Sequence, residues 1–248
     1  MNTPLWFSLW SFPAPYVGNE PAYVDETEMR CSQAFTMHAE AIRSEVLTYL
    51  KKHETIPYFK QSMVQEGKGY HTQSLAWWGI KFHKNQRELP VLSSILTHHP
   101  ELLTLSINVL DANSSILPHM GDTNSIYRGH FGISIPASLA QAGIRFKEVD
   151  RSWQEGHFIW FMDAYPHETW NHTKESRIVL LVDVLRPEFS NQKKRICATV
   201  MTSLFLQKRI EKHTFFSRNQ QWIVKYVAPM LIPLVQFRMA WINFMRKY

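Results

Sequence analysis

The run Ile-Tyr-Arg-Gly-His-Phe-Gly-Ile-Ser-Ile (126–135) decides the fold. Side chains alternate along an extended chain, so Arg128 and His130 share one face of this segment. The opposite face is apolar and carries Phe131, Ile133 and Ile135. This alternation predicts a strand that projects Arg128 and His130 together.

Working outward from this run, further segments have strand character and follow one another at intervals of about ten residues, separated by turn residues. They are residues 104–110, 116–119, 143–149, 156–162, 166–170 and 176–185. Many short strands with this spacing are typical of an antiparallel sandwich or barrel. We therefore expect a mainly β fold.

Helical segments are expected on both sides of the strands. Residues 27–53 carry apolar side chains at helical spacing, which predicts one amphipathic helix over a sheet face, and a short helix is expected at 91–98. After Pro187 the pattern becomes helical again over 190–212 and 222–247. Pro229 and Pro233 should kink or divide the last of these helices. We assign residues 1–189 to the β domain and 190–248 to a helical tail.

Length and cysteine content agree with one substantial intracellular domain. The chain has 248 residues, enough to bury a core. Cys31 and Cys197 offer no disulfide framework, which suits a reducing cytosol. The aromatic first ten residues lack the features of a secretory signal, so they are expected to pack on the domain or to cap the substrate site.

The tail differs in charge from the rest of the chain. Residues 193–248 hold eleven Lys and Arg against the single acid Glu211, so the tail carries a net charge of +10 and the remainder about −4. Residues 222–245 are mostly apolar, but two prolines and Arg238 disfavour a membrane span. A basic, aromatic-rich helix can lie on an anionic membrane surface. Packing on the barrel or on a second subunit are the alternatives, and no nucleic-acid-binding motif is present.

Three residues have the spacing of a metal and keto-acid site, namely His119, His167 and Arg177. Two neutral imidazoles suit Fe(II) and similar metals, and they leave most positions of an octahedral ion open for catalysis. If 166–170 and 176–180 form a hairpin that turns near His172, His167 lies opposite Arg177. One ligand could then contact the metal with one end and the guanidinium with the other.

The motifs are Leu-Pro-His-Met-Gly-Asp-Thr-Asn (117–124), Tyr-Arg-Gly-His-Phe-Gly (127–132), Asp-Ala-Tyr-Pro-His-Glu-Thr-Trp (163–170) and Ser-Arg-Ile-Val-Leu-Leu-Val-Asp-Val (176–184). In this order they resemble the aspartyl/asparaginyl β-hydroxylase family of Fe(II)- and 2-oxoglutarate-dependent dioxygenases, over about residues 75–190. The resemblance implies a double-stranded β-helix (jelly roll, cupin-like) core. N-terminal helices would flank it, and a C-terminal helical extension would follow.

The resemblance also implies residue roles. His119 and His167 would bind Fe(II), and Arg177 would pair with the distal carboxylate of 2-oxoglutarate. Arg128 with His130 would support the carboxylate nearest the metal. Where the family is expected to place a serine near the distal carboxylate, this sequence has Asn108, whose amide could substitute.

Position 121 is where the wider superfamily places an acidic third ligand. The residue here is Gly121, as in eukaryotic members of the family. Asp122 could replace the missing metal ligand, but it points away from the metal if the strand is regular, so a contact with substrate or with a metal ligand is the preferred role. Trp77, Trp78 and Trp170, with Asp122, are candidates to line the substrate pocket.

The function implied is hydroxylation of an unactivated carbon with Fe(II), 2-oxoglutarate and O2. The favoured substrate is the β-carbon of an Asp or Asn residue, or a small amino-acid-like acid. A membrane lipid acyl chain, of the lipid A type, is the main alternative, and the basic tail favours it slightly. Two other functions are open. A halogenase would also lack the carboxylate metal ligand, and a non-catalytic binding protein would have the same barrel without turnover. The expected location is cytoplasmic, with membrane association left open.

Overall fold

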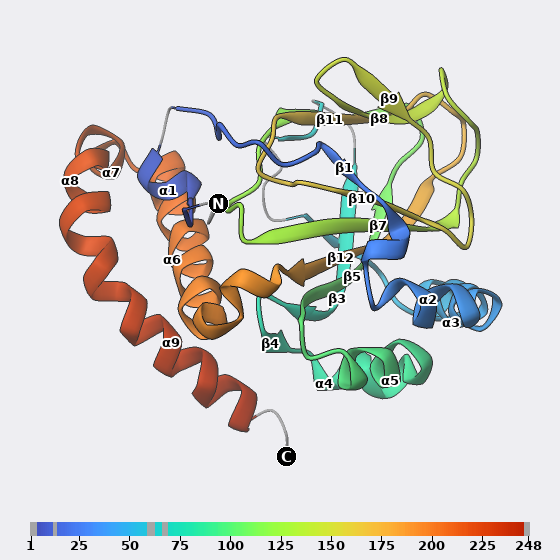
Figure 1. Cartoon of the computed structure of the whole chain (residues 1–248), viewed down its shortest axis with the longest axis horizontal. Helices are drawn as coiled ribbons and strands as arrows, with labels where there is room; N and C mark the ends of the chain where they lie inside the picture. The colour runs from blue at the N-terminus through green and yellow to red at the C-terminus, as the bar shows by residue number, and fades with distance from the viewer. Residues whose placement is uncertain (1–3, 12–13, 59–62, 66–68, 246–248) are drawn as a thin grey trace.

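The computed structural model describes residues 4–11, 14–58, 63–65 and 69–245. Arg246 and Lys247 of the basic tail, and the first three residues, lie outside these ranges. Strands in the described part form two antiparallel sheets (Figure 1). The larger has the order β1 (Tyr23–Val24), β10 (Phe158–Phe161), β7 (Ile126–Ser134), β12 (Arg177–Leu185), β5 (Leu102–Leu110), β3 (Tyr70–Trp77) and β2 (Ile56–Pro57), with β4 (Ile80–Lys81) paired to β3.

The smaller sheet has the order β6 (Ser114–His119), β11 (His167–Asn171), β8 (Ala142–Phe146) and β9 (Val149–Arg151). The two sheets face each other, because side chains from β8 pack in one cluster with side chains from β10 and β12. Ile144, Phe161 and Val179 in this cluster are almost completely buried. The predicted jelly-roll fold is therefore confirmed.

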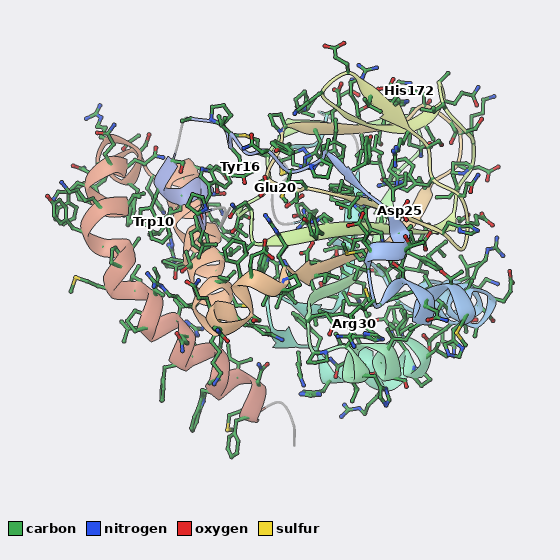
Figure 2. The ribbon with its side chains drawn as sticks, viewed as in Figure 1. Trp10, Tyr16, Glu20, Asp25, Arg30 and His172 are labelled. Carbon is green, nitrogen blue, oxygen red and sulfur yellow. The ribbon has the colours of Figure 1, made fainter. Side chains whose placement is uncertain are left out.

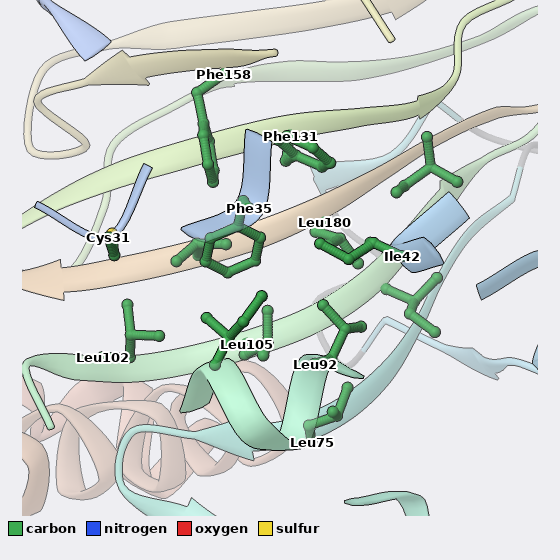
Figure 3. Close-up of a cluster of buried hydrophobic side chains, with 14 of the residues drawn as sticks. Cys31, Phe35, Ile42, Leu75, Leu92, Leu102, Leu105, Phe131, Phe158 and Leu180 are labelled. Atoms are coloured by element: carbon green, nitrogen blue, oxygen red, sulfur yellow. The ribbon is translucent and has the colours of Figure 1, made fainter. Parts of the chain in front are cut away.

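Helices cover the outer face of the larger sheet. The predicted single helix over 27–53 is wrong, since it consists of η1 (Glu26–Glu28), α2 (Ser32–Met37) and α3 (Ala39–Lys52). The backbone leaves helical geometry at His38, with φ −109° and ψ 18°. Apolar periodicity did not reveal the break because Phe35 before it and Ile42 after it both pack on the sheet (Figure 3).

Two further helices, α4 (His83–Glu88) and α5 (Pro90–His98), follow β4. The predicted helix at 91–98 is confirmed as α5, whose Leu92 and Ile95 are buried. Helix α4 lies beside the end of β3, where Asn85 donates to the carbonyl oxygen of Ser74 at 2.7 Å. This contact places α4 at the edge of the larger sheet.

The predicted hairpin between 166–170 and 176–180 is wrong. Strand β11 pairs with β6 and β8, whereas β12 pairs with β5 and β7 in the other sheet. The loop 172–176 therefore crosses between the sheets, as a jelly roll requires. As a result, His167 has His119 as its cross-strand partner, and Arg177 has Leu110.

The tail consists of η3 (Pro187–Gln192), α6 (Lys193–Lys212), α7 (Thr214–Arg218), α8 (Gln220–Trp222), the π-helical segment η4 (Ile223–Val227) and α9 (Ala228–Met245). Helices α6 and α9 run side by side at one edge of the molecule (Figure 1). Of the two expected effects of Pro233, a kink or a division of the last helix, division is contradicted, since α9 continues through Pro233. The irregular turn lies earlier, in η4, just before Pro229.

The first described residues pack on the domain. Trp6 donates its backbone N–H to the side-chain oxygen of Asn124 at 2.8 Å, and Ser8 donates to the carbonyl oxygen of Asp122 at 3.0 Å. In the short helix α1 (Ser8–Ser11), Leu9 is buried in a cluster with Leu206 and Ile223 of the tail. The segment 4–11 thus contacts both the loop after His119 and the tail.

Candidate active site

His119 and His167 lie next to each other on β6 and β11, with ring centroids 4.1 Å apart. The Nδ1 atom of His119 is 2.8 Å from the carbonyl oxygen of Leu117, and that of His167 is 2.8 Å from the carbonyl oxygen of Tyr165. A carbonyl can only accept, so each Nδ1 carries the proton and each Nε2 presents a lone pair. A backbone carbonyl that fixes the tautomer in this way is the usual support of a metal-binding histidine.

Burial keeps both imidazoles neutral. It lowers the pKa of His119 well below its usual value and that of His167 to about 4; the His167 ring further lowers the pKa of His119, and Arg128 further lowers that of His167. Neutral imidazole is the form that binds metals. Within the described residues, no group of three His, Cys, Asp or Glu is arranged to hold a metal ion. The two imidazoles are therefore the pair to which the described residues limit a metal site of this kind.

Asp163 lies beside this pair, in the space that Gly121 leaves open. A Cβ atom built on Gly121 would lie 1.8 Å from Asp163 Oδ2 and 2.8 Å from the backbone oxygen of Asp163. Asp163 Oδ1 is 3.6 Å from His167 Nε2, and Oδ2 has no hydrogen-bond partner in the described structure. Sequence reasoning did not identify Asp163, although the residue opens the quoted motif 163–170. Asp163 lies so close to Gly121 that a side chain at position 121 would collide with it.

Arg128 points to the same space but is held by protein carboxylates. Its Nε and Nη2 atoms donate to the two oxygens of Asp183 at 2.6 and 3.0 Å, and its Nη1 donates to Asp163 at 2.8 Å. The two acids are buried, so Arg128 compensates charges that would otherwise be costly. The structure therefore gives Arg128 carboxylate partners of its own, in addition to any co-substrate.

Donors without partners gather around His130 and Arg177. The Arg177 side chain is buried, 1% exposed, and its guanidinium lies 4.5 Å from the Trp153 ring. Among the described residues, Arg177 Nε and Nη1 have no hydrogen-bond partner, and neither does His130 Nδ1. Burial lowers the pKa of Arg177 to about 10, which still leaves it charged at neutral pH. A buried guanidinium with free donors needs an anion.

Thr169 is a further residue that sequence reasoning missed. It lies two positions after His167 on β11, so alternation turns both side chains to the interior. Its hydroxyl is buried and has no hydrogen-bond partner in the part of the chain that the structure describes, and Thr169 borders the same cavity. The sequence could have identified Thr169, because a threonine two residues after His167 on a strand places its hydroxyl on the same face as the histidine.

Asn108 lies on the floor of the site, on β5. Its Nδ2 donates to the Tyr70 hydroxyl at 2.6 Å, and its Oδ1 accepts from the Ser106 hydroxyl at 2.6 Å. One amide N–H is left for another acceptor. The position expected from the resemblance is therefore inside the site, with its amide oriented by two neighbours.

A cavity of about 670 Å³ connects these residues. It is bordered by five of the six predicted residues, namely Asn108, His119, Arg128, His130 and His167. Arg177 is not among its lining residues because its side chain is stacked on Trp153. Apolar and aromatic side chains on the remaining lining are Met63, Trp77, Trp78, Phe82, Ile116 and Leu204, and the polar residues Thr72, Gln73, Ser74, His83 and Asn85 lie among them. Lys84 and Arg87 of α4 also border the cavity.

The expected pocket residues divide in two. Trp77, Trp78 and Asp122 line the cavity, as expected. Trp170 does not, because it alternates with His167 and faces outward, where the guanidinium of Arg145 lies 5.4 Å from its ring.

Comparison with known proteins assigns the family. The model of the aspartyl/asparaginyl β-hydroxylase family matches residues 36–187, which is more than half of the chain. The chain belongs to the aspartyl/asparaginyl β-hydroxylase family. It is an enzyme of the dioxygenase type, and the resemblance seen in its motifs is confirmed.

Two relatives of this hydroxylase differ in the class of molecule that their names describe. An ornithine lipid ester-linked acyl 2-hydroxylase from Rhizobium tropici is 27% identical over 192 residues, covering 75% of this chain and 68% of that protein. The human aspartyl/asparaginyl beta-hydroxylase is 27% identical over 160 residues. That match covers 62% of this chain but only 21% of the human protein.

The solved structure of a Pseudomonas putida prolyl-4-hydroxylase has a distant likeness to this hydroxylase. It is 12% identical with a TM-score of 0.38, and the match covers 62% of this chain and 87% of that one.

Proposed function

We propose that this hydroxylase uses Fe(II), 2-oxoglutarate and O2 to hydroxylate an acyl chain of a membrane lipid. The observation that carries the proposal is the lining of the cavity, which combines two neutral imidazoles and polar atoms without partners among the described residues with a set of large apolar side chains. The imidazoles and polar atoms suit a metal with a dicarboxylate, and the apolar side chains suit a hydrocarbon chain.

The residues present fit the proposed cofactors. His119 and His167 would hold Fe(II) through their Nε2 atoms, since each Nδ1 is already bonded to a backbone carbonyl. The free donors of Arg177 and His130, with the hydroxyl of Thr169, would receive the carboxylates of 2-oxoglutarate. When bound, iron and 2-oxoglutarate activate O2 so that one oxygen atom enters a C–H bond of the substrate.

The protein's own contribution is position and charge balance. Backbone carbonyls orient the two imidazoles, and Arg128 neutralises the buried Asp163 and Asp183 beside them. Trp78 and Ile116 would exclude water around the target carbon because both are buried in the cavity wall.

A lipid substrate is favoured over an Asp or Asn residue by the cavity walls. Phe82, Ile116 and Leu204 present only hydrocarbon to the cavity, which suits an acyl chain better than a polar side chain. The lipid hydroxylase from Rhizobium tropici, which matches 75% of this chain, supports the same choice. An Asp or Asn residue remains the second candidate, because the family name and the human relative favour it. A lipid substrate would place the enzyme at a membrane.

A halogenase is disfavoured by Asp163. A halide would need the space beside Gly121, and the unpartnered carboxylate oxygen of Asp163 occupies it. An anion next to an anionic oxygen is repelled in a low-dielectric site.

The test begins with succinate formation by the purified protein supplied with Fe(II), ascorbate and 2-oxoglutarate. His119→Ala should abolish succinate formation and Arg177→Ala should reduce it strongly, whereas Arg145→Ala, which changes an exposed arginine on β8, should leave it unchanged. Wild-type protein is then incubated separately with extracted lipids and with an Asp- and Asn-containing peptide, and products are analysed by mass spectrometry. A gain of one oxygen on an acyl chain supports the proposal. A gain only on the peptide moves the assignment to the second candidate, and incorporation of chloride would assign the halogenase.

A further inference from the structure

Helix α9 is apolar on both of its long faces. Its inner face packs on α6 and the end of the barrel through Ile232, Val235, Met239 and Ile242. Its outer face, continued through α8 and η4, carries large apolar side chains every three or four residues. These side chains, each more than half exposed, form an apolar stripe of Trp222, Tyr226, Met230, Leu234, Phe237, Trp241 and Met245.

The exposure of this apolar stripe is unusual for a helix packed on a protein. Met230 and Phe237 are 72% and 73% exposed. Side chains project from the outer side of α9, away from the rest of the molecule (Figure 2). A surface helix normally turns polar residues to water, so a contiguous apolar face marks an interaction site.

Positive charge accompanies the apolar stripe. Residues 220–245 contain no Asp or Glu, and they include Lys225 and Arg238, both exposed. The Lys225 ammonium lies 5.2 Å from the Tyr226 ring, and on the neighbouring helix Arg209 lies 5.2 Å from the Phe205 ring. Trp and Tyr beside Lys and Arg are the side chains that proteins place at the boundary between lipid headgroups and acyl chains. The surface therefore complements an anionic bilayer.

The inner contacts of α9 argue against a helix that crosses the membrane. In length and composition, residues Gln220–Met245 could span a bilayer. However, Asn243 Nδ2 donates to the carbonyl oxygen of Gly79 at 2.8 Å, and its Oδ1 accepts from the backbone N–H of Lys81 at 2.9 Å. A spanning helix would break these bonds and bury Asn243 and Arg238 in hydrocarbon, at high cost. A helix that lies in the plane of the surface keeps both.

We infer that the apolar stripe is a membrane-docking face, which lies in the plane of an anionic bilayer while the inner side of α9 stays packed on the barrel. The docked helix ends beside β4, and the cavity-lining residues Trp77 and Phe82 flank that strand. The docked helix and the cavity wall therefore meet at β4. The membrane contact itself does not depend on the proposed substrate.

The test is co-sedimentation of the full-length protein with phosphatidylcholine vesicles that do or do not contain phosphatidylglycerol. Binding is expected to the anionic vesicles and to weaken with salt. The triple variant Met230→Ser/Phe237→Ser/Trp241→Ser should bind at least about 100-fold less, because each side chain contributes roughly ten-fold when buried. Arg238→Gln should reduce binding about five-fold.

The control is Val17→Ser/Met37→Ser/Val149→Ser, which removes exposed apolar side chains from other surfaces and should leave vesicle binding unchanged. Thermal melting checks that both triple variants are folded. Failure of the wild-type protein to bind anionic vesicles, or equal binding by the two triple variants, overturns the inference.

Two other occupants of the apolar stripe give distinct results. A dimer in light scattering that disappears in the stripe variant, without vesicle binding by the wild type, assigns the face to a second copy of the chain. Resistance of membrane-bound protein to alkaline carbonate assigns a span. Succinate formation by the stripe variant in solution reports separately on the proposed function, so failure of one proposal is distinguishable from failure of the other.

Discussion

The two sheets of the barrel carry different parts of the site. The smaller sheet contributes the imidazoles of His119 and His167, which are cross-strand partners fixed by one register. The larger sheet contributes Arg128 and His130 from β7, Arg177 from β12 and Asn108 from β5, so its charged and polar groups are spread over three strands. We infer that metal binding depends on a single pairing, whereas binding of the dicarboxylate is shared among several groups. Substitutions on the smaller sheet should therefore be nearly all-or-none, and those on the larger sheet graded.

The largest effect is expected for His167→Ala on the smaller sheet. One imidazole alone would hold the metal weakly. Loss of a residue that only supports a metal ligand lowers activity by about 10–100-fold, so loss of the ligand itself should lower turnover by well over 100-fold. The measurements are Fe(II) affinity by competition with a chromogenic chelator, and succinate formation. His172→Ala, which changes an exposed histidine on the crossing loop (Figure 2), is the matched control and should have no effect. Retention of metal affinity by His167→Ala would remove the basis of the comparison.

Arg177→Ala tests the larger sheet. Removing one partner of a buried charge pair costs about 2–5 kcal/mol, so the dissociation constant for 2-oxoglutarate should rise by at least about 30-fold. Fe(II) affinity should stay near that of the wild type, because no bond to His119 or His167 is lost. Isothermal titration with 2-oxoglutarate, in the presence of a redox-inert metal, measures the first quantity. Equal loss of metal and 2-oxoglutarate binding would mean that metal binding and 2-oxoglutarate binding are not assigned to separate sheets.

Gly121→Ala sharpens the comparison at the end of β6. The new methyl group would collide with the carboxylate and the backbone oxygen of Asp163, so the free energy of unfolding should fall by about 1–3 kcal/mol. Gly79→Ala is a poor control because Gly79 has φ +80°. The second variant is instead Gly121→Ala/Asp163→Ala, which should regain part of the stability by removing one side of the collision. Unfolding in urea measures both, and wild-type stability of Gly121→Ala would show that the loop moves freely.

Thr169→Val is expected to have the smallest effect and to act in opposite directions on two quantities. The Thr169 hydroxyl is buried without a partner, so its removal should raise the stability of the ligand-free protein by about 1 kcal/mol. The same change should weaken 2-oxoglutarate binding by about five-fold, since one hydrogen bond to the ligand is lost. Thermal melting and titration measure the two effects. A loss of stability without 2-oxoglutarate would show that the hydroxyl has a structural partner.

The sequence predicted most of the strands because their side chains alternate. The run 126–135 became β7 with Phe131 and Ile133 buried, and 176–185 became β12. The segment Tyr70–Trp77 was missed, since its mixture of His, Thr, Gln and Ser gives no clean apolar face, although it pairs with β5 beneath the site. Periodicity also cannot distinguish a hairpin from two strands in opposite sheets, which is why the 166–180 hairpin was wrong.

The candidate site was predicted to the extent that its motifs are contiguous. His119, His130 and His167 gather at one cavity, as their motifs indicated. Asp163 could not be recognised because its significance depends on contact with Gly121 and Arg128, which lie more than thirty residues away in sequence. Such relations depend on which strands are neighbours, and that is a property of the folded chain.

The segment 4–11 joins two parts of the molecule that are otherwise far apart in sequence. Its backbone is hydrogen-bonded to the loop that follows His119 at the end of β6, and Leu9 is buried among tail helices. Any fusion partner or protease nick placed at this segment would therefore disturb the proposed metal site and the packing of the tail at once. Affinity tags for biochemical work are better inserted in an exposed turn of the barrel, such as the one around Leu139.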